Sequence, residues 1–208
     1  TMSGIVGGIN LRSSGLVNIS SASDGQVFTG TGAGLPVGFE AAAGGGKVLQ
    51  CIQNHVTTKS TQSLSASTYA DITNLEHAIT PTESDSNILV DIRWCGELGH
   101  AQPQDCVFGI NRDSTPIGLP SVSGDQTLGI MLISTPMHSV AAGDNTPEHA
   151  QYRFMDTARS AGTSEITYKA TVSFQNSATM YNNRTVDDAN TIWNEYLTST
   201  VILWEISA

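Results

Sequence analysis

The stretch NILVDIRWCGE, residues 87–97, shows the clearest alternation of apolar and polar side chains in the chain. Ile88, Val90, Ile92 and Trp94 fall on one side of an extended backbone, because successive side chains of a strand point to opposite faces. A period of two residues indicates a strand with one buried and one exposed face. Residues 87–97 therefore predict a β-sheet with a core on one side.

Short apolar stretches like this one recur from Lys47 to the end of the chain, separated by turn signals at a spacing of roughly ten residues. Pro116 and Gly118 in DSTPIG predict a turn. This spacing is typical of a sandwich or barrel, and we predict an all-β, antiparallel β-sandwich of the jelly-roll kind. The other predicted strands cover residues 48–56, 75–79, 107–112, 128–133, 151–155, 165–174, 179–183 and 199–207.

The closing stretch STVILWEIS, residues 199–207, is apolar on both faces. Ile202, Trp204 and Ile206 share one face, and Val201 and Leu203 share the other. A strand of a two-layer antiparallel sandwich normally shows one face to water, so something must cover this one. Sister copies in a closed cyclic oligomer are one solution, with Val201 and Leu203 at the interface. The chain's own loops are the other.

Composition sets further limits. Only 13% of the 208 residues are charged and the net charge is −10, so nucleic acid and anionic membrane surfaces would repel the chain. Twenty glycines argue against a mainly helical protein. No apolar stretch approaches the roughly 20 residues of a membrane span, and no signal peptide opens the chain. We expect neither nucleic-acid binding nor membrane insertion.

Residues 1–46 differ from the rest of the chain. They hold 12 of the 20 glycines and three charged residues, Arg12, Asp24 and Glu40. Ordering such a segment costs much backbone entropy, and it offers little apolar area in return. We therefore predict two parts: an irregular attachment or shaft segment over residues 1–46, which partners would order, and a head domain over residues 47–208. A plain linker is the alternative for the first part.

Motifs for catalysis and metal binding are missing from the sequence. The five histidines are scattered, and the acidic pairs Glu83 with Asp85 and Asp187 with Asp188 lack the spacing of a calcium loop. No G-x-S-x-G motif exposes a nucleophilic serine. The odd number of cysteines indicates buried free thiols or a single bridge. We expect no catalytic residue, no metal and no cofactor.

Seven phrases, in this order, carry a resemblance to a known class of protein: GQVFTGTGAGLPVG, GKVLQCIQ, LEHAITPTESDSNILVDIRW, FGINRDSTPIG, TYKATVSF, MYNNRT and STVILWEIS. Over residues 24–208 the chain resembles head domains of tail-fibre and other virion structural proteins of tailed phages, especially marine ones. The start MSGIVGGINLRSSGLV is similar to amino-terminal segments of phage virion proteins. The three cysteines and the longer region STPMHSVAAGDNTPEHAQ depart from the pattern.

The resemblance implies a homotrimeric head displayed on a virion that is assembled in the host cytoplasm, with residues 1–46 contacting other virion proteins. The first hypothesis is host attachment, in which exposed loops bind a surface glycan or protein. The second is a capsid decoration or head-fibre protein that stabilises the particle and binds no receptor. Candidate receptor contacts lie in or beside three loops, residues 99–105, 139–149 and 181–196, and are His100, Gln102, Gln104, His138, Asp144, His149, Trp193 and Tyr196.

Overall fold

A computed structural model describes residues 26–30, 37–41, 46–100, 105–121, 124–134, 147–192 and 194–208. The chain divides into two units, residues 1–45 and 46–208, and each is described by itself. In the first unit, β1 (Gln26–Gly30) pairs antiparallel with β2 (Val37–Ala41). The segment predicted to be mostly irregular thus contains a two-stranded sheet.

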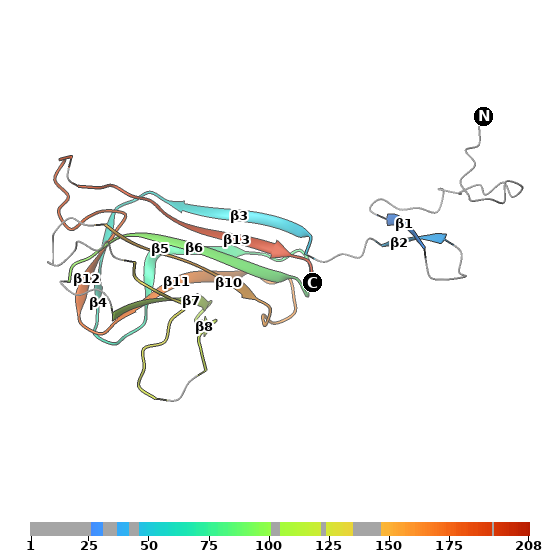
Figure 1. The fold of residues 1–208 in the computed structure, drawn as a ribbon, viewed down its shortest axis with the longest axis horizontal. Helices are drawn as coiled ribbons and strands as arrows, with labels where there is room; N and C mark the ends of the chain where they lie inside the picture. Colours follow the sequence, from blue (N-terminus) through green and yellow to red (C-terminus); the bar gives the residue numbers. More distant parts are fainter. Residues whose placement is uncertain are drawn as a thin grey trace, which may run out of the picture. The chain divides into compact units, whose positions relative to one another are not determined.

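The second unit is a sandwich of two antiparallel sheets (Figure 1). No described residue belongs to an α-helix, so no described helix could cross a membrane. The predicted all-β sandwich is confirmed. The large sheet contains, in order, β3 (Val48–Val56), β13 (Ser199–Ile206), β6 (Asn87–Leu98), β12 (Ala178–Asn182) and β4 (Ser60–Leu64), and β10 (Glu148–Asp156) also pairs with β6. The small sheet contains β5 (Ala70–Ile79), β11 (Ile166–Phe174), β7 (Cys106–Arg112) and β8 (Thr115–Ile117), and β9 (Met131–Leu132) also pairs with β7.

Strand β6 lies in the middle of the large sheet and carries much of the core. Ile88, Val90, Ile92 and Trp94 are fully buried, while the residues between them are half-buried, as the alternation predicted. The Trp94 ring packs on Phe108 of the small sheet, with 5.2 Å between ring centroids. The apolar side of β6 therefore joins the two sheets.

Strand β13 corrects one prediction. Val201 and Leu203 are both fully buried in the core of the single chain, so they have no surface left for a second copy, and their assignment to an oligomer interface is wrong. The opposite side, with Ile202, Trp204 and Ile206, is half-buried and faces outward. Both sides of the strand are apolar, so the sequence pattern could not tell which side faces the core.

Two local predictions also change. The turn in DSTPIG falls at Asp113 and Ser114, and Pro116 lies within β8. Asp113 has a φ of 56°, a left-handed conformation that aspartate tolerates better than most residues. Strand β8 is at the sheet edge, where the missing N–H of Pro116 is tolerated. Strand β4 escapes prediction from the sequence because Leu64 is its one apolar residue.

Candidate functional site

The predicted receptor contacts do not form one cluster. His100 packs its ring edge against Phe174, with 4.9 Å between centroids, so it serves local packing. His149 is exposed on β10 opposite Cys95, within the sheet and not in a loop. Tyr196 is 60% exposed. Gln102, Gln104, His138, Asp144 and Trp193 lie outside the described residues.

We call the end of the sandwich where Ser199 begins β13 the free end. Here Lys59 contacts two side chains: its Nζ lies 4.5 Å from the Tyr196 ring centroid and 2.5 Å from Asp188 Oδ1. Tyr196 donates its hydroxyl hydrogen to the Thr57 carbonyl. The hydrogen bond from Lys59 lowers the pKa of Asp188, with a further contribution from Arg184. These side chains stay exposed, so they present an aromatic ring and a charged pair to solvent.

Asn183 fixes the base of the loop that carries Tyr196. It is fully buried and has a φ of 60°. Its Nδ2 donates to the carbonyls of Val56 and Thr58, both at 3.0 Å, and its Oδ1 accepts from Ser199 Oγ at 2.6 Å. Such a satisfied buried amide is a structural element, and it holds the exposed residues of this loop in place.

The opposite end, where Lys47 begins the sandwich and Ser207 follows β13, is called the joined end (Figure 1). Glu205 is fully buried here. Burial alone would raise its pKa, but hydrogen bonds from surrounding groups outweigh burial and lower the pKa to about 2. Its carboxylate accepts hydrogen bonds from Gln50 Nε2, Thr82 N, Thr82 Oγ1, Glu83 N and Ser86 Oγ at 2.7–3.0 Å.

Arg159 braces the same end from the loop between β10 and β11. Its guanidinium donates to the carbonyls of Glu83, Ser86, Ser160 and Gly162 at 2.5–3.2 Å. It also donates to Ser86 Oγ at 2.8 Å. The loop of residues 157–165 is thereby held against the segment between β5 and β6. Sequence reasoning missed these hydrogen bonds at the joined end. The one pattern that could have indicated them is that Arg159 and Glu205 are each an isolated charged residue among apolar or small neighbours.

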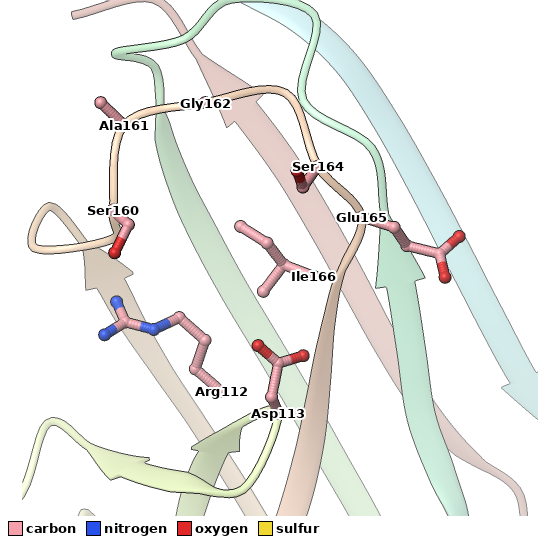
Figure 2. Close-up of a pocket in the computed structure, with 8 residues that line it drawn as sticks. All are labelled: Arg112, Asp113, Ser160, Ala161, Gly162, Ser164, Glu165 and Ile166. Carbon is pink, nitrogen blue, oxygen red and sulfur yellow. The ribbon is translucent and has the colours of Figure 1, made fainter.

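This braced loop forms one wall of a shallow pocket with a volume of about 230 Å³ (Figure 2). The turn after β7 and the start of β11 form the remaining walls. The Asp113 and Ser164 side chains point toward the space around Ile166, the Arg112 guanidinium lies beside Ser160 at the edge of the pocket, and Glu165 and Ala161 point away. None of these pocket residues was predicted, because they come from two stretches that lie far apart in the sequence, residues 112–113 and 160–166.

The two outer faces of the sandwich differ in how far other parts of the chain bury their side chains. On the small sheet, Val107, Thr171 and Ser173 point outward and are nevertheless buried. Residues beyond β8 lie over part of this face: Leu119 lies against Gly109, Gly129 against Val107, and Leu128 exchanges two hydrogen bonds with the Tyr69 hydroxyl. The chain itself therefore covers the part of this face over β7, whereas the outward residues Asp71, Thr73 and Glu76 of β5 are exposed.

The outward side of β3, β13, β6 and β10 is called the open face. Strand register places its side chains in rows across the four strands, and apart from Glu97 near the end of β6 none of them is buried. One row is apolar and consists of Cys51, Trp204, Leu89 and Met155. A hollow of about 320 Å³ lies in the neighbouring polar rows and is lined by Gln53, Asp91, Arg93, Gln151, Arg153, Thr200 and Ile202.

Arg93 stands out in the hollow of the open face. Its Nε is buried and has no hydrogen-bond partner among the described residues, and its Nη2 lies 3.4 Å from both oxygens of Thr198. Arg153, by contrast, donates to Asp91 at 2.8 Å. A buried donor without an acceptor costs free energy, so Arg93 Nε destabilises this face slightly in the single chain.

The described residues contain no group of three side chains that could hold a metal ion. Burial raises the pKa of the Cys106 and Cys95 thiols, which keeps them protonated and weakly nucleophilic. Cys51 is exposed, contrary to the expectation that the thiols are buried. Three features of the described residues are accessible to a partner or ligand: the free end, the pocket of Figure 2 and the open face.

No known protein family and no curated protein matches this chain.

Proposed function

We propose that this chain is a phage virion structural protein whose residues 46–208 form the head of a fibre-type homotrimer that recognises a host surface. The open face is the observation that carries this proposal. A sheet face with a row of aliphatic and aromatic side chains is typical of a surface that another chain covers. Because part of the other outer face is covered by the chain itself and its exposed β5 residues Asp71, Thr73 and Glu76 are polar, the open face is the more suitable side for sister copies.

The chemistry of the open face suits association between copies. Trp204 and Leu89 supply apolar area on two neighbouring strands of this face, toward the joined end. Aromatic residues are among those that contribute most to interface energy. Arg93 and Arg153 line the hollow beside this row and supply positively charged groups. The whole chain carries a net charge of −10, so an acidic group on another copy is a readily available acceptor.

The two ends of the sandwich suit a fibre head as well. Residues 1–45 precede Gly46, which lies at the joined end beside Ile206. The free end lies at the other end of β13 and exposes Tyr196 and, to 88%, Ile192. Several copies of such an end on one particle would raise avidity even if each copy bound weakly.

The function is tested by probing an array of bacterial surface polysaccharides, both lipopolysaccharide and capsule, with the full chain. Binding to a subset of polysaccharides supports host recognition. Loss of that binding in a dissociated variant, with residual binding at high concentration, would show the contribution of avidity. A blank array at several salt concentrations argues against recognition of a glycan.

A second assay separates attachment from capsid decoration. Residues 46–208 contain a complete core, so they can be prepared without residues 1–45. If this head alone blocks adsorption of the phage to its host, attachment is supported. If the head has no effect while the full chain binds isolated capsids, the protein decorates the particle.

A further inference from the structure

The pocket of Figure 2 has a fixed basic group. Arg112 Nη1 donates to both carboxylate oxygens of Asp156 at 2.9 Å, and the Tyr168 hydroxyl donates to Asp156 Oδ2 at 2.8 Å. Asp156 is 1% exposed, so this ion pair is held from the inside of the sandwich. The guanidinium is therefore oriented before any ligand arrives, and Asp156 already balances its charge.

The opposite wall of the pocket is equally fixed. Ser160 and Gly162 belong to the loop that Arg159 holds through their carbonyls at 3.2 and 2.9 Å. Gly162 N donates in addition to the Ser84 carbonyl at 2.8 Å. The pocket is thus preorganised although it is shallow, and binding would not have to order this loop.

The groups that line the pocket both donate and accept hydrogen bonds. Ser160 and Ser164 contribute hydroxyl groups, and Arg112 contributes N–H donors. Asp113 Oδ1 accepts from Thr167 N at 3.0 Å, and Asp113 Oδ2 has no partner among the described residues. Ile166 lies between them as an apolar floor. Mixed donors and acceptors over an apolar floor match a ring that carries hydroxyl groups on an aliphatic skeleton.

Charge and size narrow the choice of ligand. Because Asp156 balances Arg112, the carboxylates of Asp113 and Glu165 give the pocket surroundings a negative charge, which disfavours an anion. A metal ion is disfavoured because Glu165 points away from the pocket. The volume of about 230 Å³ is below the range of roughly 300–1,000 Å³ for drug-sized ligands. The class of ligand that fits the pocket is therefore a small neutral molecule.

We infer that this pocket binds one neutral sugar ring. It lies beside the joined end, so it is a second recognition site apart from Tyr196 at the free end. That the ring belongs to a polysaccharide of a host surface rests on the proposed function, whereas the binding of the ring itself rests on the pocket alone.

The test uses the full chain and free glucose, galactose, mannose and N-acetylglucosamine as probes in saturation-transfer NMR. Ser164→Trp fills the pocket, and Thr163→Trp is the matched control, because Thr163 is an exposed neighbour that does not line the pocket. Asp113→Asn removes the negative charge from the pocket with little effect on its backbone. Asparagine tolerates the left-handed conformation and keeps an oxygen that accepts from Thr167 N.

We expect saturation transfer to at least one of these sugars, an affinity loss of about tenfold or more in Ser164→Trp and a change within about twofold in Thr163→Trp. Absence of transfer to every sugar would overturn the inference. So would equal binding by the two tryptophan variants. If Ser164→Trp loses the free sugar but still binds the polysaccharide array, the pocket is a sugar site and the free end is the receptor site. If free sugar binds and the array is blank, the proposed function fails while the pocket inference stands.

Discussion

The two outer faces of the sandwich are built from similar strands and yet end in different states. On the small sheet, Val107 points outward and lies against Gly129, and the outward Thr171 and Ser173 are buried as well. On the large sheet, Trp204 and Leu89 are apolar and point outward, and they keep part of their surface exposed. An isolated domain would gain free energy by burying this remaining apolar surface. The difference teaches that the open face is suited to contact with another chain.

The largest expected effect is a loss of stability from a change on the buried side of β13. Glu205→Gln removes a charge that five hydrogen bonds stabilise, and we expect it to lower the free energy of unfolding by roughly 3 kcal/mol at neutral pH. This change acts on the fold and not on the open face. Denaturant unfolding measures it, and an unchanged midpoint would contradict the role assigned to Glu205 at the joined end.

The stabilisation by the Glu205 carboxylate should depend on pH. Its pKa falls from 4.5 in the unfolded chain to about 2 in the folded one, so its stabilisation is fully present above pH 4.5 and disappears as the pH falls toward 2. The stability gap between wild type and Glu205→Gln should therefore close over that pH window. A gap that stays constant down to pH 2 would show that the carboxylate is not responsible.

Trp204→Ser tests the open face itself. We expect this change to weaken association between copies by about 2 kcal/mol or more per contact, because truncating a central aromatic residue of an interface has effects of that size. Stability of the isolated head should change much less, since Trp204 lies outside the core cluster. Sedimentation velocity measures the association, with His55→Ser on the same face but outside the apolar row as control. Equal sedimentation of the two variants would refute the role of the apolar row.

Gly129→Ala tests the covered face. A Cβ at this position would lie 2.7 Å from Val107 Cβ, so the covering segment must shift. Such overpacking costs about 1–3 kcal/mol. We expect lower stability and faster amide exchange at the buried outward residues of the small sheet, with association between copies unchanged. A fully tolerated substitution would mean that the cover is loose.

Tyr69→Phe is the smallest expected change. The Tyr69 hydroxyl donates to the Leu128 carbonyl and accepts from Leu128 N, and Tyr69 itself is 44% exposed. Removing the hydroxyl should cost about 1 kcal/mol. Thermal unfolding measures the loss. A loss above that of Gly129→Ala would show that this hydroxyl, more than the close packing at Gly129, holds the cover in place.

How far the sequence predicts this structure depends on the range of the interaction. The alternation in β6 was sufficient to predict its faces, because a strand's period of two residues is a local property. For β13, both faces are apolar, and the choice between Val201 and Trp204 as the buried set depends on which side meets the small sheet. The hydrogen bond from Thr82 N to Glu205 joins residues that are 123 positions apart in the sequence, so no local pattern could predict it. The pocket of Figure 2 was beyond prediction for the same reason, since Arg112, Ser160 and Ile166 meet only in the folded chain.

Light scattering of the purified full chain, with Trp204→Ser beside it, decides whether sister copies cover the open face. We expect a wild-type mass three times that of one chain and a shift toward the mass of a single chain in the variant. A wild-type protein that keeps the mass of one chain at high concentration would contradict the claim that sister copies cover the open face.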